Sequence, residues 1–290
     1  MSYLEYKNYY FIGIGGIGMS AMAEYVLSIN KNIAGYDREE SFSTNRLESL
    51  GIKIINQDNP DYINLKFKEN KKTLVVYTPA ISSSNSILKY FKKNKFKIIK
   101  RSDLLAEVVN SKFCIAIAGT HGKTTTTSIL SHILFNSKLK FTSFIGGIIR
   151  GYESNIILNG NKIFLVEADE YDKTFLKIKP NIASIINIDG DHYDIYSNIY
   201  DLKKSFKKFT KNLKEGGILF HDSTLDFNGF SFGFDSNSNA QIINLTHIEG
   251  KSIFDIKINE DIFKNVELNM PGTHNAMNAL VAFLIAIELK

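Results

Sequence analysis

The sequence is poor in cysteine, proline and tryptophan. Cys114 is the single cysteine among 290 residues, beside four prolines and no tryptophan. One cysteine excludes an internal disulfide framework, so we predict a cytoplasmic protein. The first residues, Met1–Tyr6, contain no basic segment, long apolar stretch or small-residue cleavage site, and we expect no secretory leader.

Long hydrophobic runs are also missing. No uninterrupted apolar run reaches the roughly 18 residues that a membrane span needs, and the longest candidate is Leu280–Ile287. The mean hydropathy is −0.10. We therefore predict no membrane partner. The length of 290 residues allows two domains of ordinary size, and 44% hydrophobic with 22% charged residues is normal for a globular protein.

Arginine is scarce although the net charge is +5: lysine and arginine together number 35, of which only four are arginine. Lysine, isoleucine and asparagine make up about a third of the chain, the bias expected from AT-rich codons. We expect the lysine clusters at 89–100 and 203–214 to be solvated helix faces, with a phosphate-binding patch as the less favoured alternative. Because arginine reads bases and phosphates bidentately, its scarcity argues against a nucleic-acid partner.

Predicted strands and helices alternate along the chain, which is typical of an α/β protein with a mostly parallel sheet. A strand, a glycine turn and a helix occur first at residues 9–29, and the same pattern begins again at residue 113. We predict one domain at 1–107 and a second at 108–290. Further strands are expected at 32–36, 52–55, 73–78, 97–100, 113–118, 163–166 and 182–186, and a C-terminal helix at 279–289.

The first glycine turn satisfies the pattern G-x-G-x-x-G at Gly13, Gly15 and Gly18. Asp37 ends the next predicted strand at a suitable distance. Glycines let main-chain N–H groups approach a pyrophosphate at a helix N-terminus, and the acid can hold ribose hydroxyls. The turn predicts a Rossmann-like nucleotide site, while glycines that serve only tight packing are the alternative.

A second glycine loop, Gly119–Thr125, lies between a predicted strand and a helix. It is a shortened variant of a P-loop, because the first glycine of the usual spacing would fall on Ile117. Loop amides cradle phosphates, Lys123 neutralises the terminal phosphates, and the hydroxyl of Thr124 can ligate Mg²⁺. The loop therefore predicts a P-loop-type ATP-binding domain.

Two polar segments follow apolar strands of the second domain. Glu167–Asp172 contains four carboxylates in six residues, and Asn187–His192 follows the strand at 182–186. Such carboxylates repel one another unless a cation lies among them, and strand C-termini are where α/β sheets bind ligands. His192 can complete a metal site with them, although a lone histidine is more often structural.

Asparagines mark the start of the C-terminal helix, in the segment Pro271–Asn278. Asn275 and Asn278 share a helix face at i and i+3, and their carboxamides suit a purine edge. A routine helix N-terminus explains the segment equally well.

Read together, these segments resemble the Mur ligases over essentially the whole chain, and most of all their alanine-adding branch. The matching segments, in order, are Gly13–Gly18 with Met19–Ser20, Tyr77–Ile81, Gly119–Thr126, Glu167–Asp172, Asn187–His192 and Pro271–Asn278. Tyr77–Ile81 and the short run between Asp172 and Pro180 are more similar to the alanine-adding branch than to the relative that recycles a tripeptide.

The resemblance implies ATP-dependent ligation of L-alanine to UDP-N-acetylmuramate through an acyl phosphate. Lys123, Glu167 and His192 would be catalytic, with Thr124, Glu167 and His192 holding Mg²⁺. The implied ATP site comprises Gly119, Thr120, His121, Gly122, Lys123, Thr124, Thr125, Asn275 and Asn278. The implied UDP-sugar site comprises Gly13, Gly15, Gly16, Gly18, Ser20 and Asp37. Some sister ligases carry a carbamylated lysine after the Asp-His pair, and that role is assigned to none of Lys203, Lys204, Lys207 and Lys208.

The resemblance also implies a third domain, which binds the incoming amino acid and would follow Lys290. We expect a shortened or split product whose third domain is supplied by a separate chain or lacking, and poor ligation by these 290 residues alone. The rival readings are a nicotinamide-dependent oxidoreductase, which leaves Gly119–Thr125 unexplained, and a non-catalytic nucleotide-binding module.

Overall fold

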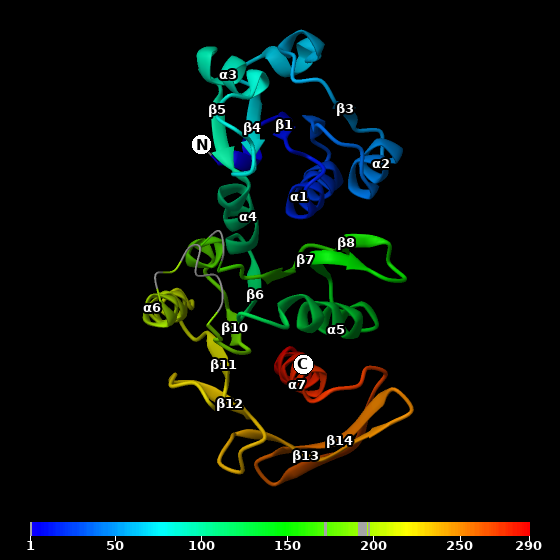
Figure 1. Cartoon of the computed structure of the whole chain (residues 1–290), viewed down its shortest axis with the longest axis vertical. Coiled ribbons are helices and arrows are strands. Elements are labelled where there is room, and N and C mark those ends of the chain that lie inside the picture. Colours follow the sequence, from blue (N-terminus) through cyan, green and yellow to red (C-terminus); the bar gives the residue numbers. More distant parts are fainter. Residues whose placement is uncertain (1, 171–172, 191–195, 197) are drawn as a thin grey trace. The chain divides into compact units, whose positions relative to one another are not determined.

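Two compact units make up the protein in a computed structural model that describes residues 2–170, 173–190, 196 and 198–290. Unit 1 comprises Met1–Ser111 and Phe144–Leu158, and unit 2 comprises Lys112–Ser143 and Asn159–Lys290 (Figure 1). Both are α/β, which confirms the predicted fold class. The domain ranges 1–107 and 108–290 stay predictions.

Unit 1 is built on a five-stranded sheet in the order β3-β2-β1-β4-β5, in which all pairs are parallel. Its strands are β1 (Asn8–Ile12), β2 (Asn32–Tyr36), β3 (Lys53–Ile55), β4 (Thr73–Tyr77) and β5 (Lys97–Lys100), and its helices are α1 (Ile17–Ser28), α2 (Phe42–Ser49), α3 (Ser86–Lys93) and α4 (Arg101–Asn110). Strand order reverses beside β1, and open α/β sheets bind ligands at such a switch point.

Unit 2 repeats this plan around β6. The sheet order is β15-β14-β13-β12-β11-β10-β6-β9-β7-β8, and β6 pairs in parallel with β10 and β9. From β6 to β11 the chain forms β6 (Phe113–Ala118), α5 (Lys123–Phe135), β7 (Phe141–Ile149), β8 (Ser154–Leu158), β9 (Ile163–Glu167), β10 (Ile182–Ile185), α6 (Ile199–Thr210) and β11 (Ile218–Asp222). Of these, β8 and residues 144–149 of β7 belong to unit 1. The second glycine loop thus leaves the buried central strand, β6, at a second switch point.

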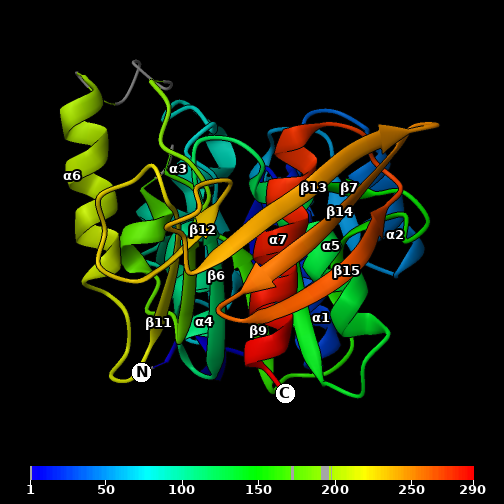
Figure 2. The same ribbon diagram turned by 90° about the horizontal axis from the view of Figure 1, so that it is seen from below.

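The sheet of unit 2 ends in an antiparallel meander that we did not expect. Its strands are β13 (Ala240–Ile248), β14 (Lys251–Ile258) and β15 (Asp261–Leu268), which pair antiparallel. β12 (Phe230–Gly233) precedes the meander and pairs in parallel with β11 and β13. Helix α7 (Thr273–Glu288) packs against α5 on one side and against β13 and β14 on the other (Figure 2). The meander therefore covers the face of α7 that lies opposite α5. The buried residues of α7 include Asn278.

Several element bounds differ from the expected ones. α1 begins at Ile17 rather than at Ser20, and α7 begins at Thr273 rather than at Ala279. The expectation that the lysine cluster at 89–100 lies on helix faces is wrong beyond Lys93, where α3 ends, whereas the strand expected at 97–100 is confirmed as β5. In the part of the chain that the structure describes, no helix is long and apolar enough to cross a membrane.

Candidate active site

The glycine turn of unit 1 is shaped by its neighbours. Gly13 has a φ of +82°, and a Cβ there would lie 2.6 Å from Thr78 Cγ2. Its N–H donates to the carbonyl of Tyr36 at 2.7 Å. The N–H of Gly15 donates to Asp37 Oδ2, also at 2.7 Å. Position 13 therefore requires glycine, and the predicted acid lies directly on the turn.

The first turn of α1 is held from two sides. A Cβ on Gly18 would lie 2.9 Å from Arg101 Nη1, so a guanidinium packs on this glycine. Ser20 is buried and its hydroxyl donates to a main-chain carbonyl within the turn. Asn155 of β8 donates to the same hydroxyl at 3.1 Å. The structure brings the predicted residues Gly13, Gly15, Gly16, Gly18, Ser20 and Asp37 to one turn, with the hydroxyl of Ser20 engaged inside it.

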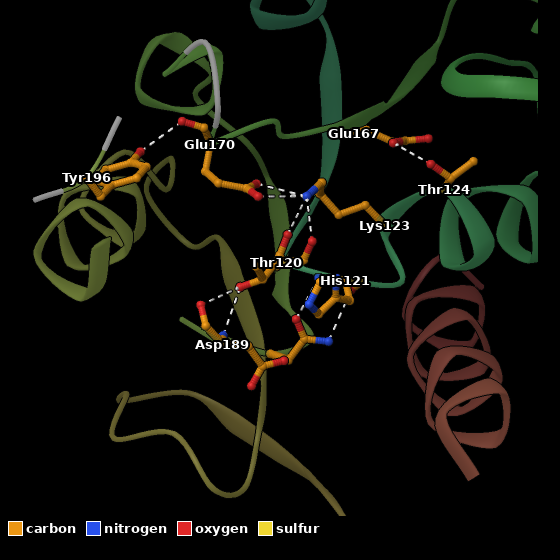
Figure 3. A network of polar contacts seen from close by, with 10 residues as sticks. Thr120, His121, Lys123, Thr124, Glu167, Glu170, Asp189 and Tyr196 are labelled. Atoms are coloured by element: carbon orange, nitrogen blue, oxygen red, sulfur yellow. Dashed lines mark hydrogen bonds and ion pairs between the residues drawn. The ribbon is translucent and has the colours of Figure 1, made fainter. Parts of the chain in front are cut away.

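The loop before α5 is fixed by the end of β10. Gly119 and Gly122 have φ angles of +143° and +81°, a region that favours glycine. The carboxamide of Asn187 accepts from the N–H of His121 at 2.8 Å and donates to its carbonyl at 3.1 Å. The hydroxyl of Thr120 accepts from the N–H of Asp189 at 2.9 Å (Figure 3). These contacts tie the loop that precedes α5 to the segment that follows β10.

Lys123 is the first residue of α5 and lies among oxygen atoms. Its Nζ donates to the carbonyls of Gly119 at 2.6 Å and Thr120 at 3.2 Å. It also lies 3.0 and 2.9 Å from the two carboxylate oxygens of Glu170, as the dashed lines of Figure 3 show. The Lys123 side chain is 14% exposed and that of Glu170 is fully buried. This ion pair joins the first residue of α5 to the acidic segment after β9.

Thr124 and Glu167 form a second pair beside the first. The hydroxyl of Thr124 donates to Glu167 Oε2 at 3.0 Å. A hydroxyl and a carboxylate oxygen this close fit a hard cation such as Mg²⁺. The third predicted ligand, His192, lies outside the described residues. So do Tyr171 and Asp172 of the first acidic segment and Asp191 of the second. Among the residues with a described placement, no three His, Cys, Asp or Glu side chains lie close enough together to hold a metal ion.

The two asparagines predicted to face a purine differ in their surroundings. Asn278 is buried, and its Oδ1 lies 2.5 Å from the position that a Cβ on Gly122 would take. The carboxamide of Asn275 donates to the carbonyl of Pro271 at 2.7 Å. The structure therefore brings Asn278 against the loop Gly119–Thr125, called the lysine loop below. Asn275 instead bonds to the segment before its own helix.

Two residues at the lysine loop were not assigned from the sequence. Glu170 and Asn187 stand in motifs that we had singled out, but their partners depend on how β9 and β10 flank β6. Tyr196 donates its hydroxyl to the carbonyl of Glu170 at 2.8 Å. Burial raises the pKa of Tyr196 to about 12, so the phenol keeps the proton that it donates.

Comparison with known proteins identifies this arrangement. Residues 8–113 match the model "Mur ligase family, catalytic domain", and residues 117–286 match "Mur ligase middle domain". The chain is 44% identical to a UDP-N-acetylmuramate–L-alanine ligase of Christiangramia forsetii over 97% of its own length, and 43% identical to that of Flavobacterium psychrophilum over 99%. It spans 63% and 64% of these two relatives, respectively.

Solved structures agree with this assignment. The UDP-N-acetylmuramate–alanine ligase of Thermotoga maritima is similar with a TM-score of 0.84 at 25% identity, over 97% of this chain and 65% of that one. A ligase from Neisseria meningitides, described as acting on UDP-N-acetylmuramate and an L-alanyl-γ-D-glutamyl-meso-diaminopimelate peptide, gives 0.83 at 23% identity, over 98% and 93%. The second likeness concerns the fold alone. With two family models and these relatives in agreement, the chain belongs to the Mur ligase family.

Proposed function

We propose that this chain carries the nucleotide-binding and UDP-sugar-binding parts of an ATP-dependent ligase that joins L-alanine to UDP-N-acetylmuramate in peptidoglycan precursor synthesis. The observation that carries the proposal is the arrangement of Lys123, Thr124 and Glu167 at the N-terminus of α5. The glycine turn of unit 1, Gly13–Gly18, supplies a separate nucleotide-type site. A cytoplasmic location is part of the proposal.

In the proposed reaction, the lactyl carboxylate of the UDP-sugar takes the γ-phosphoryl group of ATP, and ADP leaves. The amine of L-alanine attacks the resulting acyl phosphate and phosphate departs, which forms the amide. Lys123 stabilises negative charge on the transferred phosphoryl group, because its ammonium stands at the helix N-terminus where phosphates bind. Gly119–Thr125 and Asn278 enclose the nucleotide, and Asn275 and His192 stay predictions.

Thr124 and Glu167 are the residues that would hold Mg²⁺, with His192 as the further predicted ligand. When bound, Mg²⁺ supplies Lewis-acid neutralisation of the phosphate charge. Gly13, Gly15, Gly16, Gly18, Ser20 and Asp37 are proposed to shape the site for the UDP-sugar, where the main-chain donors of the turn suit a diphosphate.

A tripeptide-adding ligase that uses the same UDP-sugar is the second candidate. The relatives that are 44% and 43% identical to the chain over the aligned residues are both named as L-alanine ligases. The similar structure that is described with a tripeptide is 23% identical. We therefore propose L-alanine as the amine substrate. A separate chain that supplies an amino-acid-binding domain stays a prediction.

Calorimetric titration tests the proposal. We expect the chain to bind one equivalent of UDP-N-acetylmuramate and one of Mg-ATP at independent sites, and to bind NADH at neither. Absence of binding by both nucleotides, or tight binding of NADH, would overturn it. Phosphate release by these 290 residues alone should be slow, but it should depend on the UDP-sugar and be greater with L-alanine than with the tripeptide. Mass spectrometry should identify the ligated product.

A further inference from the structure

The ammonium of Lys123 is fully engaged by acceptors of the protein itself. Four oxygen atoms lie within hydrogen-bonding distance of Nζ, from Gly119, Thr120 and both carboxylate arms of Glu170. An ammonium has only three protons to donate. A phosphate oxygen that bonds to Lys123 must therefore displace, or share a proton with, one of these acceptors.

Glu170 is a rigidly placed acceptor rather than a surface side chain. Its side chain is fully buried, and its main-chain carbonyl accepts the hydroxyl of Tyr196. Two residues earlier, the N–H of Ala168 donates to the carbonyl of Ile117 in β6 at 2.8 Å. The carboxylate is therefore anchored to the same central strand that carries the lysine loop.

Of the acceptors around Lys123, the carboxylate most resembles a phosphate. It is anionic and offers two oxygens, whereas the carbonyls of Gly119 and Thr120 are neutral parts of the loop. Charge-assisted hydrogen bonds are roughly twice as strong as neutral ones. A terminal phosphate near Lys123 would also be repelled by the carboxylate at short range.

We propose that Glu170 sets the nucleotide affinity of this site by competing with the terminal phosphates of the nucleotide for the protons of Lys123. The inference rests on the proposed function, since it takes the Gly119–Thr125 loop to be the ATP site. Glu170 is a positioning residue in this scheme, because it acts through Lys123. Its carboxylate holds the ammonium in place and lowers the net attraction of the loop for polyphosphate.

The test compares Glu170→Gln with the unchanged chain by calorimetry in EDTA, with ADP and AMP as the probes. Glutamine keeps the shape and one acceptor but removes the charge. We expect ADP to bind about tenfold more tightly to the variant. AMP should bind equally to both, because a P-loop lysine reaches the β- and γ-phosphates. Glu215→Gln, which removes an exposed carboxylate of unit 2, is the matched control and should leave both affinities unchanged.

A double-mutant cycle identifies the route of the effect. If Glu170 acts mainly through Lys123, the gain from Glu170→Gln is larger in the unchanged chain than in the Lys123→Ala background, where only the direct repulsion of the phosphate is left. Unchanged or weaker ADP binding by Glu170→Gln would overturn the proposal, and so would a gain that is at least as large without Lys123. If Glu170→Gln does not fold, Glu170→Asp replaces it, since a shorter carboxylate should also release Lys123 and tighten ADP binding. Failure of the unchanged chain to bind ADP would count against the proposed function instead.

Discussion

The two glycine loops of this protein follow one plan and differ in charge. In each unit, the loop follows the first strand, whose two neighbours in the sheet are parallel to it, and starts a helix. A carboxylate that follows one of these neighbouring strands reaches the loop. Asp37 accepts the N–H of Gly15 in unit 1, whereas Glu170 pairs with Lys123 in unit 2. The turn Gly13–Gly18 contains no basic residue.

This difference separates two ways of binding a phosphorylated ligand. The turn of unit 1 offers main-chain donors, the partial charge of a helix terminus and the guanidinium of Arg101 packed on Gly18, which suit a diphosphate that stays intact. The loop of unit 2 carries its positive charge on the first residue of the helix itself, Lys123, beside a hydroxyl–carboxylate pair, which suit a phosphate that is transferred. We propose that the same local geometry serves binding in unit 1 and phosphoryl transfer in unit 2.

The largest expected effect concerns alkaline stability. Burial raises the pKa of the Cys114 thiol in unit 2 to about 12 from 9.0, with a smaller opposing effect of Lys214. The unfolded thiol ionises above pH 9 while the folded one stays protonated. The free energy of unfolding should therefore fall by up to about 1.4 kcal/mol per pH unit between pH 9 and 12.

Urea titrations at pH 8 and pH 11 measure this fall, and Cys114→Ala should remove the part that comes from the thiol. In unit 1, burial raises the pKa of Tyr9 and Tyr10 from 10.0. The free energy of unfolding of unit 1 should therefore begin to fall about one pH unit later than that of unit 2. An equal pH dependence in the Cys114→Ala variant would show that the thiol does not contribute.

Lys123→Ala should separate the two sites by affinity. Removal of the ammonium takes away charge-assisted bonds to the terminal phosphates, so ADP affinity should fall by about 100-fold. UDP-N-acetylmuramate should bind unchanged, because its proposed site lies in unit 1. Calorimetry with both ligands measures this, and Lys123→Arg is the control that keeps the charge. A parallel loss of both affinities would contradict two independent sites.

Gly13→Ala should damage unit 1 alone. The positive φ and the overlap with Thr78 together predict a loss of about 2–3 kcal/mol of unfolding free energy. Binding of UDP-N-acetylmuramate should weaken and ADP binding should persist. Gly51→Ala is the matched control, because it also has a positive φ but its Cβ would meet no atom within 4 Å. Equal losses for the two variants would rule out the overlap as the cause.

Asp37→Ala should have the smallest effect. It removes one charge-assisted acceptor from the partly exposed N–H of Gly15, and water can replace that acceptor. We expect a loss of about 1 kcal/mol in the binding of UDP-N-acetylmuramate and none for ADP. Asp37→Asn, which keeps an acceptor oxygen, should retain most of the affinity. A loss as large as that of Lys123→Ala for ADP would mean that Asp37 contacts the ligand directly.

The sequence was sufficient to predict the parts that depend on local pattern. β6, its loop and α5 follow from an apolar run, glycines and Gly122–Thr124, and β2 was predicted with its observed bounds. The meander β13–β15 was not predicted, although Ser252–Lys257 alternates between buried and less buried residues. Its turns contain positive-φ residues such as Asn259, which mark a chain reversal only weakly.

Contacts that join distant segments could not be predicted. The pairs Lys123–Glu170 and His121–Asn187 depend on which strands flank β6, and a single sequence does not specify sheet order. Asn155 stands in no motif, and only the placement of β8 beside α1 reveals its bond to Ser20. Prediction therefore reached the residue types at the site but not their partners.

The interleaved chain order of the two units limits how this protein can be divided. Phe144–Leu158 belongs to unit 1 although it follows β6 and α5 of unit 2. A fragment cut at Ser111 would lack Phe144, whose ring packs on Tyr25 of α1, as well as Asn155. During synthesis, the residues that complete unit 1 are therefore made only after β6 and α5 of unit 2. No single cut in the chain separates the two units.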